Sequence, residues 1–318
     1  MQSQDAGTST ANASLENHVQ CKLCAQPRFF KDEAVATWSA ACPDTDVPTD
    51  PASQRLWDAP LCRLKRNALV ESASSPADRA RLLAVGEWES GLWLQVLPSA
   101  NIGTLLDRST FRIATSLRLG SPCVVPHLCR CGAFVTNLGH HGLSCTRSAG
   151  RITRHHCIND VIRRALASAS VPAVLEPSGL ARDDGKRPDG MTLVPWKLGR
   201  ALVWDATCVD TLAPSHIPGT SMQAGAAAST AEALKRRKYD CLSGDLTFAA
   251  FGVETQGPWG SGAHHLFKEI AKRLVETTGD RRAGGYFAQR ISLAIQRGNA
   301  ASVLGTFADG DDIGQLNF

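Results

Sequence analysis

The stretch RPDGMTLVPWKLGRALVWDATCV, residues 187–209, decides the fold that we predict for this chain. It begins with a strand-like run and ends with a stronger one, ALVWDATCV, which is apolar and rich in β-branched residues. Between them, Pro195 and Gly199 favour a turn. Because a hairpin places its two strands side by side, we expect Asp189 and Asp205 to be neighbours in one sheet.

Helical and strand-like segments alternate around this hairpin. An amphipathic pattern before it predicts a helix, and a short apolar run predicts one more strand. After it, the sequence predicts a helix, a strand and two further helices. The segments are residues 148–170, 172–180, 229–242, 246–255, 263–277 and 287–304. The order helix, three strands, helix, strand, helices predicts an α/β domain with a central mixed sheet over residues 150–305.

The rest of the chain divides into smaller regions. We predict a disordered leader and linker over residues 1–53, because Ser, Thr, Gln, Asn and later Pro and Asp dominate it. Residues 54–120 carry mainly helical patterns, with a Ser-Ser-Pro start in one helix and Gly120 at the end of another, and predict a helical connector. Residues 306–318 predict a polar tail.

Composition restricts the class of protein only broadly. The chain has 318 residues, of which 43% are hydrophobic, and a net charge of +4, which permits nucleic-acid binding without requiring it. It contains no apolar run of about 18 residues and no apolar leader, so we expect an intracellular protein without a membrane partner. Since the 11 cysteines are clustered, we expect metal ligands in preference to disulfides.

The segment HLCRCGAFVTNLGHHGLSC, residues 127–145, predicts a small zinc-binding domain over 127–146. Three thiolates and one imidazole suit tetrahedral Zn²⁺, and the glycines allow a short chain to wrap one ion. We predict the ligands Cys129, Cys131, His140 and Cys145. His141 is the alternative histidine, and His127 is a weaker one.

A second, smaller cysteine pattern lies near the N-terminus. Cys21 and Cys24 form a Cys-x-x-Cys pair beside His18. The pair has no clear partner pair, although Cys42 or Cys62 could approach it, so we favour a structural role.

The paired carboxylates of Asp189 and Asp205 predict a second metal site. Two such groups a few ångströms apart repel each other unless a cation lies between them, and their hard oxygens select Mg²⁺ or Mn²⁺. Glu176, one strand earlier, offers a third oxygen ligand. Lys235 and Lys238 share one face of a helix, and we predict that one of them positions water and offsets developing charge.

These residues resemble the core of PD-(D/E)xK nucleases. Pro188-Asp189, then Asp205, then a lysine follow that pattern, but Thr207 stands where the family has its lysine. The resemblance therefore implies that the lysine has moved to the helix as Lys235 or Lys238. It also implies a restriction-endonuclease-like fold for the domain.

The order of the motifs resembles the C-terminal region of early-branching, site-specific non-long-terminal-repeat retrotransposon proteins. The zinc knuckle is followed by Arg154-His155-His156, then by the carboxylates, then by Lys235-x-x-Lys238-Tyr239. The resemblance implies an endonuclease that nicks target DNA to prime reverse transcription, with DNA and element RNA as partners in the nucleus. We predict nucleic-acid contacts from Arg154, His155, His156, Arg187 and Tyr239.

Two other functions remain open from the sequence. The chain could be a zinc-dependent nucleic-acid-binding remnant of a retroelement that no longer cuts. It could also be a repair or Holliday-junction nuclease with the same core. The strand–Asp-Asp–strand signature of a polymerase is not found, so we expect a reverse transcriptase region to be missing upstream.

Overall fold

The computed structural model describes residues 32–50, 53–180, 187–240 and 246–307, and the chain forms two compact units, Met1–Glu71 and Ser72–Phe318. In the first unit, residues 32–41 are helical and helix α2 spans Gln54–Glu71. The buried Trp38 donates a hydrogen bond from Nε1 to the carbonyl oxygen of Trp57 at 2.8 Å. The prediction of disorder across residues 1–53 is therefore wrong for residues 32–41. Cys21 and Cys24 lie outside the described residues.

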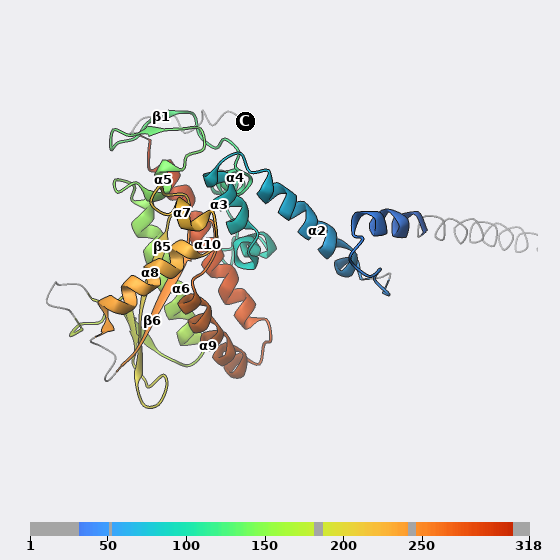
Figure 1. Cartoon of the computed structure of the whole chain (residues 1–318). Coiled ribbons are helices and arrows are strands. Elements are labelled where there is room, and N and C mark those ends of the chain that lie inside the picture. The colour runs from blue at the N-terminus through green and yellow to red at the C-terminus, as the bar shows by residue number, and fades with distance from the viewer. Residues whose placement is uncertain (1–31, 51–52, 181–186, 241–245, 308–318) are drawn as a thin grey trace, which may run out of the picture. The chain divides into compact units, whose positions relative to one another are not determined.

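The second unit is built on a mixed four-stranded sheet (Figure 1). Its strands are β3 (Ala173–Leu175), β4 (Gly190–Thr192), β5 (Ala201–Val209) and β6 (Leu246–Glu254), in that spatial order. The pairs β3–β4 and β4–β5 are antiparallel, and β5–β6 is parallel. The predicted mixed α/β fold is confirmed.

The predicted hairpin between β4 and β5 closes in a tight turn. Lys197 and Arg200 pair across it, and the φ angles of Leu198 and Gly199 are 51° and 76°. Two successive positive φ angles match the right-handed twist of the flanking strands. Between this turn and the paired part of β4, residues 193–196 stand against Ala201 alone, so the turn by itself does not set the register. The pairing of Gly190 with Trp204 places Asp189 beside Asp205.

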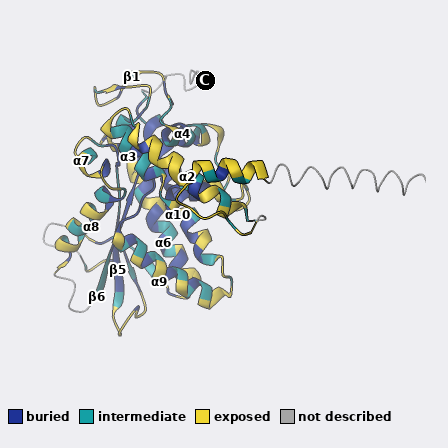
Figure 2. Cartoon of the chain, turned by 45° about the vertical axis from the view of Figure 1, so that its right-hand side comes forward, coloured by how far each residue is buried: buried dark blue, intermediate teal, exposed yellow. Residues whose placement is uncertain are grey.

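Helices cover both faces of the sheet. They are α6 (Gly150–Ser168), α8 (Ala226–Lys238), α9 (Ser261–Thr278) and α10 (Ala283–Leu304). Trp204 of β5 bonds Asn159 of α6, whereas its neighbour Asp205 pairs with Lys235 of α8. Since successive strand residues point to opposite faces, α6 and α8 lie on opposite faces of the sheet. Figure 2 shows the buried residues concentrated along β5, β6 and the inner sides of these helices.

The region predicted as a separate helical connector is divided between the two units. Beyond α2, it forms α3 (Pro76–Val85), the 3₁₀ helix η1 (Trp88–Gln95) and α4 (Arg108–Leu119). Trp93 of η1 and Ala114 of α4 pack with Leu293 of α10 in one buried cluster. The boundary therefore falls after Glu71, so residues 54–120 are mainly helical, as predicted, but do not form one separate region. None of the described helices is long and apolar enough for a membrane span.

Two buried glutamates join the helices to the sheet. Glu254 Oε1, at the end of β6, accepts hydrogen bonds from the backbone amides of Ala227 and Ala228 at the start of α8. Glu232 of α8 accepts bonds from the amides of Gly252, Gly262 and Ala263 at 2.7–2.9 Å, so it caps the start of α9. Both glutamates satisfy amides that a helix cannot satisfy by itself. The position of Glu254 at a strand end suggested polar contacts near the carboxylates. In the structure its contacts instead cap the start of α8.

Replacing Glu232 by Ala should destabilise the second unit by about 3 kcal/mol, because three buried amides lose their acceptor. Urea unfolding of the full chain measures this loss. Glu276→Ala is the matched control, since Glu276 lies exposed on α9 and its lysine pair at 3.9 Å contributes little. Equal stability of the two variants would contradict the capping role.

Candidate active site and metal centre

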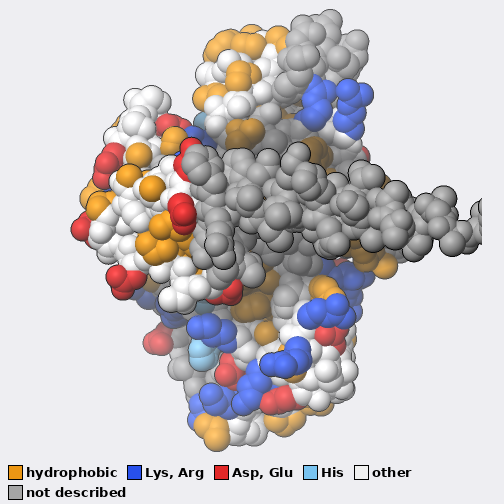
Figure 3. Space-filling model, turned by 90° about the vertical axis from the view of Figure 1, so that its right-hand side faces the viewer, with side chains coloured by type: hydrophobic (Ala, Val, Ile, Leu, Met, Phe, Trp, Pro, Cys, Tyr) orange, Lys and Arg blue, Asp and Glu red, His pale blue; other side chains and the backbone are white. Residues whose placement is uncertain are grey.

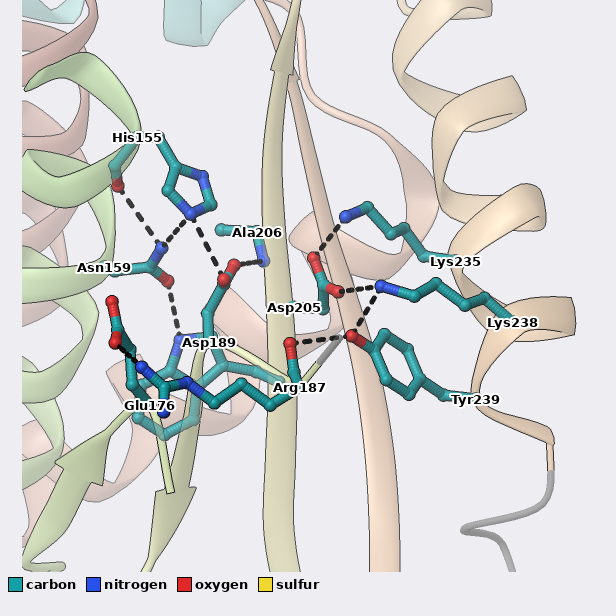
Figure 4. Close-up of polar contacts among 11 residues, drawn as sticks. His155, Asn159, Glu176, Arg187, Asp189, Asp205, Ala206, Lys235, Lys238 and Tyr239 are labelled. Atoms are coloured by element: carbon teal, nitrogen blue, oxygen red, sulfur yellow. Dashed lines mark hydrogen bonds and ion pairs between the residues drawn. The ribbon is translucent and has the colours of Figure 1, made fainter. Parts of the chain in front are cut away.

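Asp189, immediately before β4, lies beside Asp205 of β5, as predicted. In Figure 4 the Asp189 carboxylate points toward His155, and the Asp205 carboxylate points toward Lys235 and Lys238. Asp189 immediately precedes β4, and its backbone amide donates to the carbonyl oxygen of Trp204 at 3.0 Å. The amide of Ala206 donates to Asp189 Oδ2 at 2.6 Å. The backbone of β5 thus holds the Asp189 carboxylate next to Asp205.

Gly190 allows this close approach of the strands. A Cβ atom at this position would lie 2.1 Å from the Trp204 ring, closer than any real contact. Trp204 is fully buried, so its ring has no room to move away. Position 190, directly after Pro188-Asp189, therefore requires glycine, because a side chain there would collide with Trp204.

Both predicted lysines reach Asp205 from the last turn of α8. Lys235 Nζ lies 2.6 Å from Asp205 Oδ1, and Lys238 Nζ lies 3.8 Å from Oδ2. Lys238 also lies 2.7 Å from the Tyr239 hydroxyl. The side chain of Asp205 is only 2% exposed, so the carboxylate is surrounded by protein. The structure therefore brings both lysine amines to the Asp205 carboxylate, which also experiences the charge of Asp189.

The two carboxylates differ in acidity. Burial raises the pKa of Asp205, the charge of Asp189 raises it further, and Lys235 only partly offsets this. Burial also acts to raise the pKa of Asp189, but the hydrogen bond and charge of His155 outweigh it, so that pKa is lowered. An additional cation between the carboxylates would relieve the repulsion that Asp205 experiences.

His155 and Asn159 support the site from α6. His155 Nε2 lies 3.1 Å from Asp189 Oδ1, and Asn159 Oδ1 accepts a hydrogen bond from Trp204 Nε1 at 2.9 Å. The hydrogen bond to Asp189 raises the pKa of His155 above its ordinary value. Asn159 was not among the predicted site residues, although it stands one helical turn after His155 in the sequence.

The stabilising effect of His155 should depend on pH. A raised folded-state pKa means that its contribution is fully present below its ordinary pKa of about 6.5 and is lost as pH rises through the folded-state value. The difference in unfolding free energy between wild type and His155→Gln should therefore be larger at pH 6 than at pH 8.5. Chemical denaturation at both pH values measures it, and a difference that grows with pH would contradict the assigned ion pair.

Some predicted residues lie at the surface beside the site. Glu176 and Arg187 form an ion pair with each other, and both are about half exposed. The role of Glu176 as a third metal ligand stays a prediction, as does a nucleic-acid contact by Arg187. His156 is exposed, with its ring 5.8 Å from that of His155, and its predicted contact is also untested.

Two residues predicted to contact nucleic acid, Arg154 and Tyr239, are buried, and their contacts with nucleic acid stay predictions. Arg154 is 1% exposed and donates to Asn299 Oδ1 at 2.7 Å and to the carbonyl oxygen of Leu143. Tyr239 is 0% exposed, and its hydroxyl donates to the carbonyl oxygen of Arg187 at 2.9 Å. Both residue types often lie at surfaces, so the sequence alone did not indicate this burial.

A separate cluster of thiols and one imidazole forms above the sheet. The hairpin of β1 (His127–Leu128) and β2 (Phe134–Val135) is followed by the short helix α5 (His141–Ser144). Ligand atoms of Cys129, Cys131, His141 and Cys145 all lie within 4.8 Å of one another. These four side chains could bind a metal ion such as zinc. In the part of the chain that the structure describes, no other group of three or more Cys, His, Asp or Glu does so.

The preferred ligand His140 is wrong, and the alternative His141 takes its place. Cys131 Sγ lies 3.2 Å from His141 Nε2. His140 is half-buried instead, near Asp210 and Arg81, and its buried Nε2 has no hydrogen-bond partner among the described residues. Adjacent helical residues point about 100° apart, so only one of two neighbouring histidines can face the thiols.

The thiols themselves favour a cation. Burial raises the pKa of Cys129 to about 11, and its sulfur lies 3.6 Å from that of Cys145. A metal ion would replace the thiol protons and compensate the clustered charge. His127, the weakest histidine candidate, stacks on Phe307 with ring centroids 4.0 Å apart and lies 2.9 Å from Thr306 Oγ1.

The chain matches none of the protein-family models with which it was compared, and it shows no significant match to a curated protein.

Proposed function

We propose that this chain is a metal-dependent DNA endonuclease of a retroelement, with a restriction-endonuclease-like core. The observation that carries the proposal is the position of Lys235, 2.6 Å from the buried Asp205 that lies beside Asp189. Two carboxylates and a lysine are the groups that phosphodiester hydrolysis requires. Strand β5 has Thr207 two residues after Asp205 in place of a lysine. The lysine that contacts Asp205 comes from α8 instead.

The donor chemistry of the two aspartates fits Mg²⁺ or Mn²⁺. Both ions prefer carboxylate oxygens, and the raised pKa of Asp205 shows that burial and Asp189 disfavour its unneutralised charge. When bound, such an ion lowers the pKa of water and stabilises negative charge on a phosphate. His155 and the amide of Ala206 hold Asp189 in place, and Lys235 supplies a positive charge and a hydrogen-bond donor toward the attacked phosphate.

The zinc cluster belongs to the same proposal. Zn²⁺ on Cys129, Cys131, His141 and Cys145 would fix the β1–β2 hairpin next to the second unit's core, because Cys129 and Cys145 share a buried cluster with Ile113 and Val303. DNA is the proposed substrate and element RNA a further partner, in the nucleus.

A second candidate function is nucleic-acid binding without cleavage. The observation that favours it is that the carboxylate oxygens of the site already have partners within the chain. Asp205 faces Lys235 and Lys238, and Asp189 faces His155 and the amide of Ala206. A chain that keeps these pairs in the presence of Mg²⁺ would bind DNA and leave it intact.

A plasmid-nicking assay with the full, zinc-loaded chain tests the proposal. Supercoiled DNA should be nicked when Mg²⁺ or Mn²⁺ is added and should stay intact when both are omitted. Omission is preferable to a chelator, because a chelator would also remove zinc. DNA binding without nicking under every metal condition would support the second candidate instead.

Lys235→Met should reduce the nicking rate roughly 100-fold, because a charge beside the reacting phosphate is lost. Arg237→Gln removes one positive charge from an exposed position two residues away on α8 and is the matched control. Initial rates on the same plasmid measure both. Equal rates for the two variants would assign Lys235 a structural role.

A further inference from the structure

A cavity of about 420 Å³ lies between the metal centre and the carboxylate pair. Its lining comes from the turn after Cys145, the first turns of α6 and the end of β5. The lining side chains that can donate hydrogen bonds are Thr146, Ser148, Arg151, Arg154, His155 and Thr207. No Asp or Glu lines the cavity. This set of donors without carboxylates is suited to an anion.

Arg154 places a buried and uncompensated charge at this cavity. Its guanidinium donates to two neutral oxygens, Asn299 Oδ1 and the carbonyl oxygen of Leu143, and its Nε has no partner. No carboxylate pairs with it within the described residues. A buried guanidinium remains charged and is costly unless an opposite charge lies near it. An anion in the cavity would supply that charge.

Other groups at the cavity are available to such an anion. Arg151 is exposed and, among the described residues, donates only to the carbonyl oxygen of Ser144, at 3.1 Å. The hydroxyls of Thr146 and Thr207 make no hydrogen bond to any residue that the structure describes. The start of α6 has no side-chain cap, so its positive dipole end adds to the attraction.

The acidic groups nearest to this cavity are already engaged. Asp210 and Glu254 both act on the charge of Cys208. Asp210 Oδ1 accepts hydrogen bonds from the amide of Leu212 and from Thr255, and Glu254 caps α8. Elsewhere, basic and acidic side chains are interspersed, as on the face in Figure 3, and on α9 Lys272 pairs with Glu276. The basic side chains of the cavity are therefore left for an anion from solution.

We infer that this cavity binds a backbone phosphate of nucleic acid, next to the phosphate that water would attack at the site of Asp189 and Asp205. His155 belongs to both places, since it lines the cavity and contacts Asp189. Thr207 follows Asp205 by two strand residues, which is about 7 Å. Phosphates of one DNA strand rise by about 3.4 Å each along the axis, so the cavity lies one or two nucleotides from the reacting phosphate. The phosphate site rests on the proposed function for its substrate.

The salt dependence of DNA binding tests this site without any cleavage. Affinity is measured with the full, zinc-loaded chain, with magnesium omitted, over a series of salt concentrations. Arg151→Gln should weaken binding roughly tenfold at low salt, as expected for a lost charged hydrogen bond. It should also lower the slope of log affinity against log salt by about 0.9, the contribution of one phosphate contact.

Arg281→Gln is the matched control. Arg281 is exposed in the turn before α10, and 18 residues of chain, mostly helix, place it about 27 Å from Asn299. It should keep the wild-type slope. If Arg151→Gln also keeps that slope, the proposal is overturned, and a rise of the wild-type melting temperature in inorganic phosphate at matched ionic strength would then assign the cavity to a free anion. If Arg151→Gln lowers the slope but the wild-type chain never nicks DNA, the phosphate site is upheld and the nuclease activity is rejected.

Discussion

Asp205→Asn is expected to lower the rate of metal-dependent nicking roughly 10²- to 10³-fold, because one of the two charged oxygen ligands for the ion is lost. The fold should survive the change. The pKa of Asp205 is raised by burial and by Asp189, so its charged form is disfavoured in the folded chain and a neutral side chain of the same shape removes that cost. We therefore expect the melting temperature of the variant to equal or exceed that of wild type.

Asp280→Asn provides the matched control for this prediction. Asp280 lies in the turn between α9 and α10, and its carboxylate bonds the backbone of Arg282 at the surface. The same change of charge should leave nicking at the wild-type rate. A folded Asp205→Asn variant that nicks as fast as Asp280→Asn would exclude Asp205 from the reaction.

We expect the wild-type chain to bind zinc, His141→Leu to lose it and His140→Leu to keep it. Zinc in small domains contributes about 10–16 kcal/mol to binding and folding in peptides, so losing one of four ligands has a large effect. His141 Nε2 lies 3.2 Å from Cys131 Sγ, and the half-buried His140 does not belong to the cluster of thiols. Zinc per chain, measured by elemental analysis, and the melting temperature report the outcome.

The same substitution at adjacent positions makes this comparison specific. His140→Leu replaces a buried ring nitrogen that has no described partner with an apolar side chain, so the variant should fold. Zinc retained in His141→Leu but absent from His140→Leu would reverse the assignment. Zinc absent from the wild-type chain would reject the metal centre altogether.

The sequence predicted the elements of the second unit well, because their signals are local. The alternation of strands and helices around residues 187–209 gave the correct order, and Gly199 marked the turn between β4 and β5. The extra residues 193–196 on the β4 side, which set the final pairing of Gly190 with Trp204, were not predicted. The lysines followed from helical spacing, since Lys235 and Lys238 share the face of α8 that covers the sheet.

The errors concern features that depend on packing between distant segments. His140 and His141 are equivalent in sequence, and only the packing of α5 decides which one faces the thiols. The burial of Arg154, which the sequence did not indicate, comes with its hydrogen bonds to Asn299 and Leu143, 145 and 11 residues away. The boundary after Glu71 arises because η1 and α4 pack on α10, nearly 200 residues later. No local pattern carries such information.

Mn²⁺ titration of the zinc-loaded chain, followed by electron paramagnetic resonance, tests most directly whether Asp189 and Asp205 form a divalent-ion site. We predict that the wild-type chain removes Mn²⁺ from the free pool, that Asp280→Asn does the same, and that Asp205→Asn does not. The opposite result is that the folded wild-type chain takes up no more Mn²⁺ than Asp205→Asn does. In that case the charge of Asp205 is balanced by Lys235 and Lys238 and not by a divalent ion. The endonuclease account would then be contradicted.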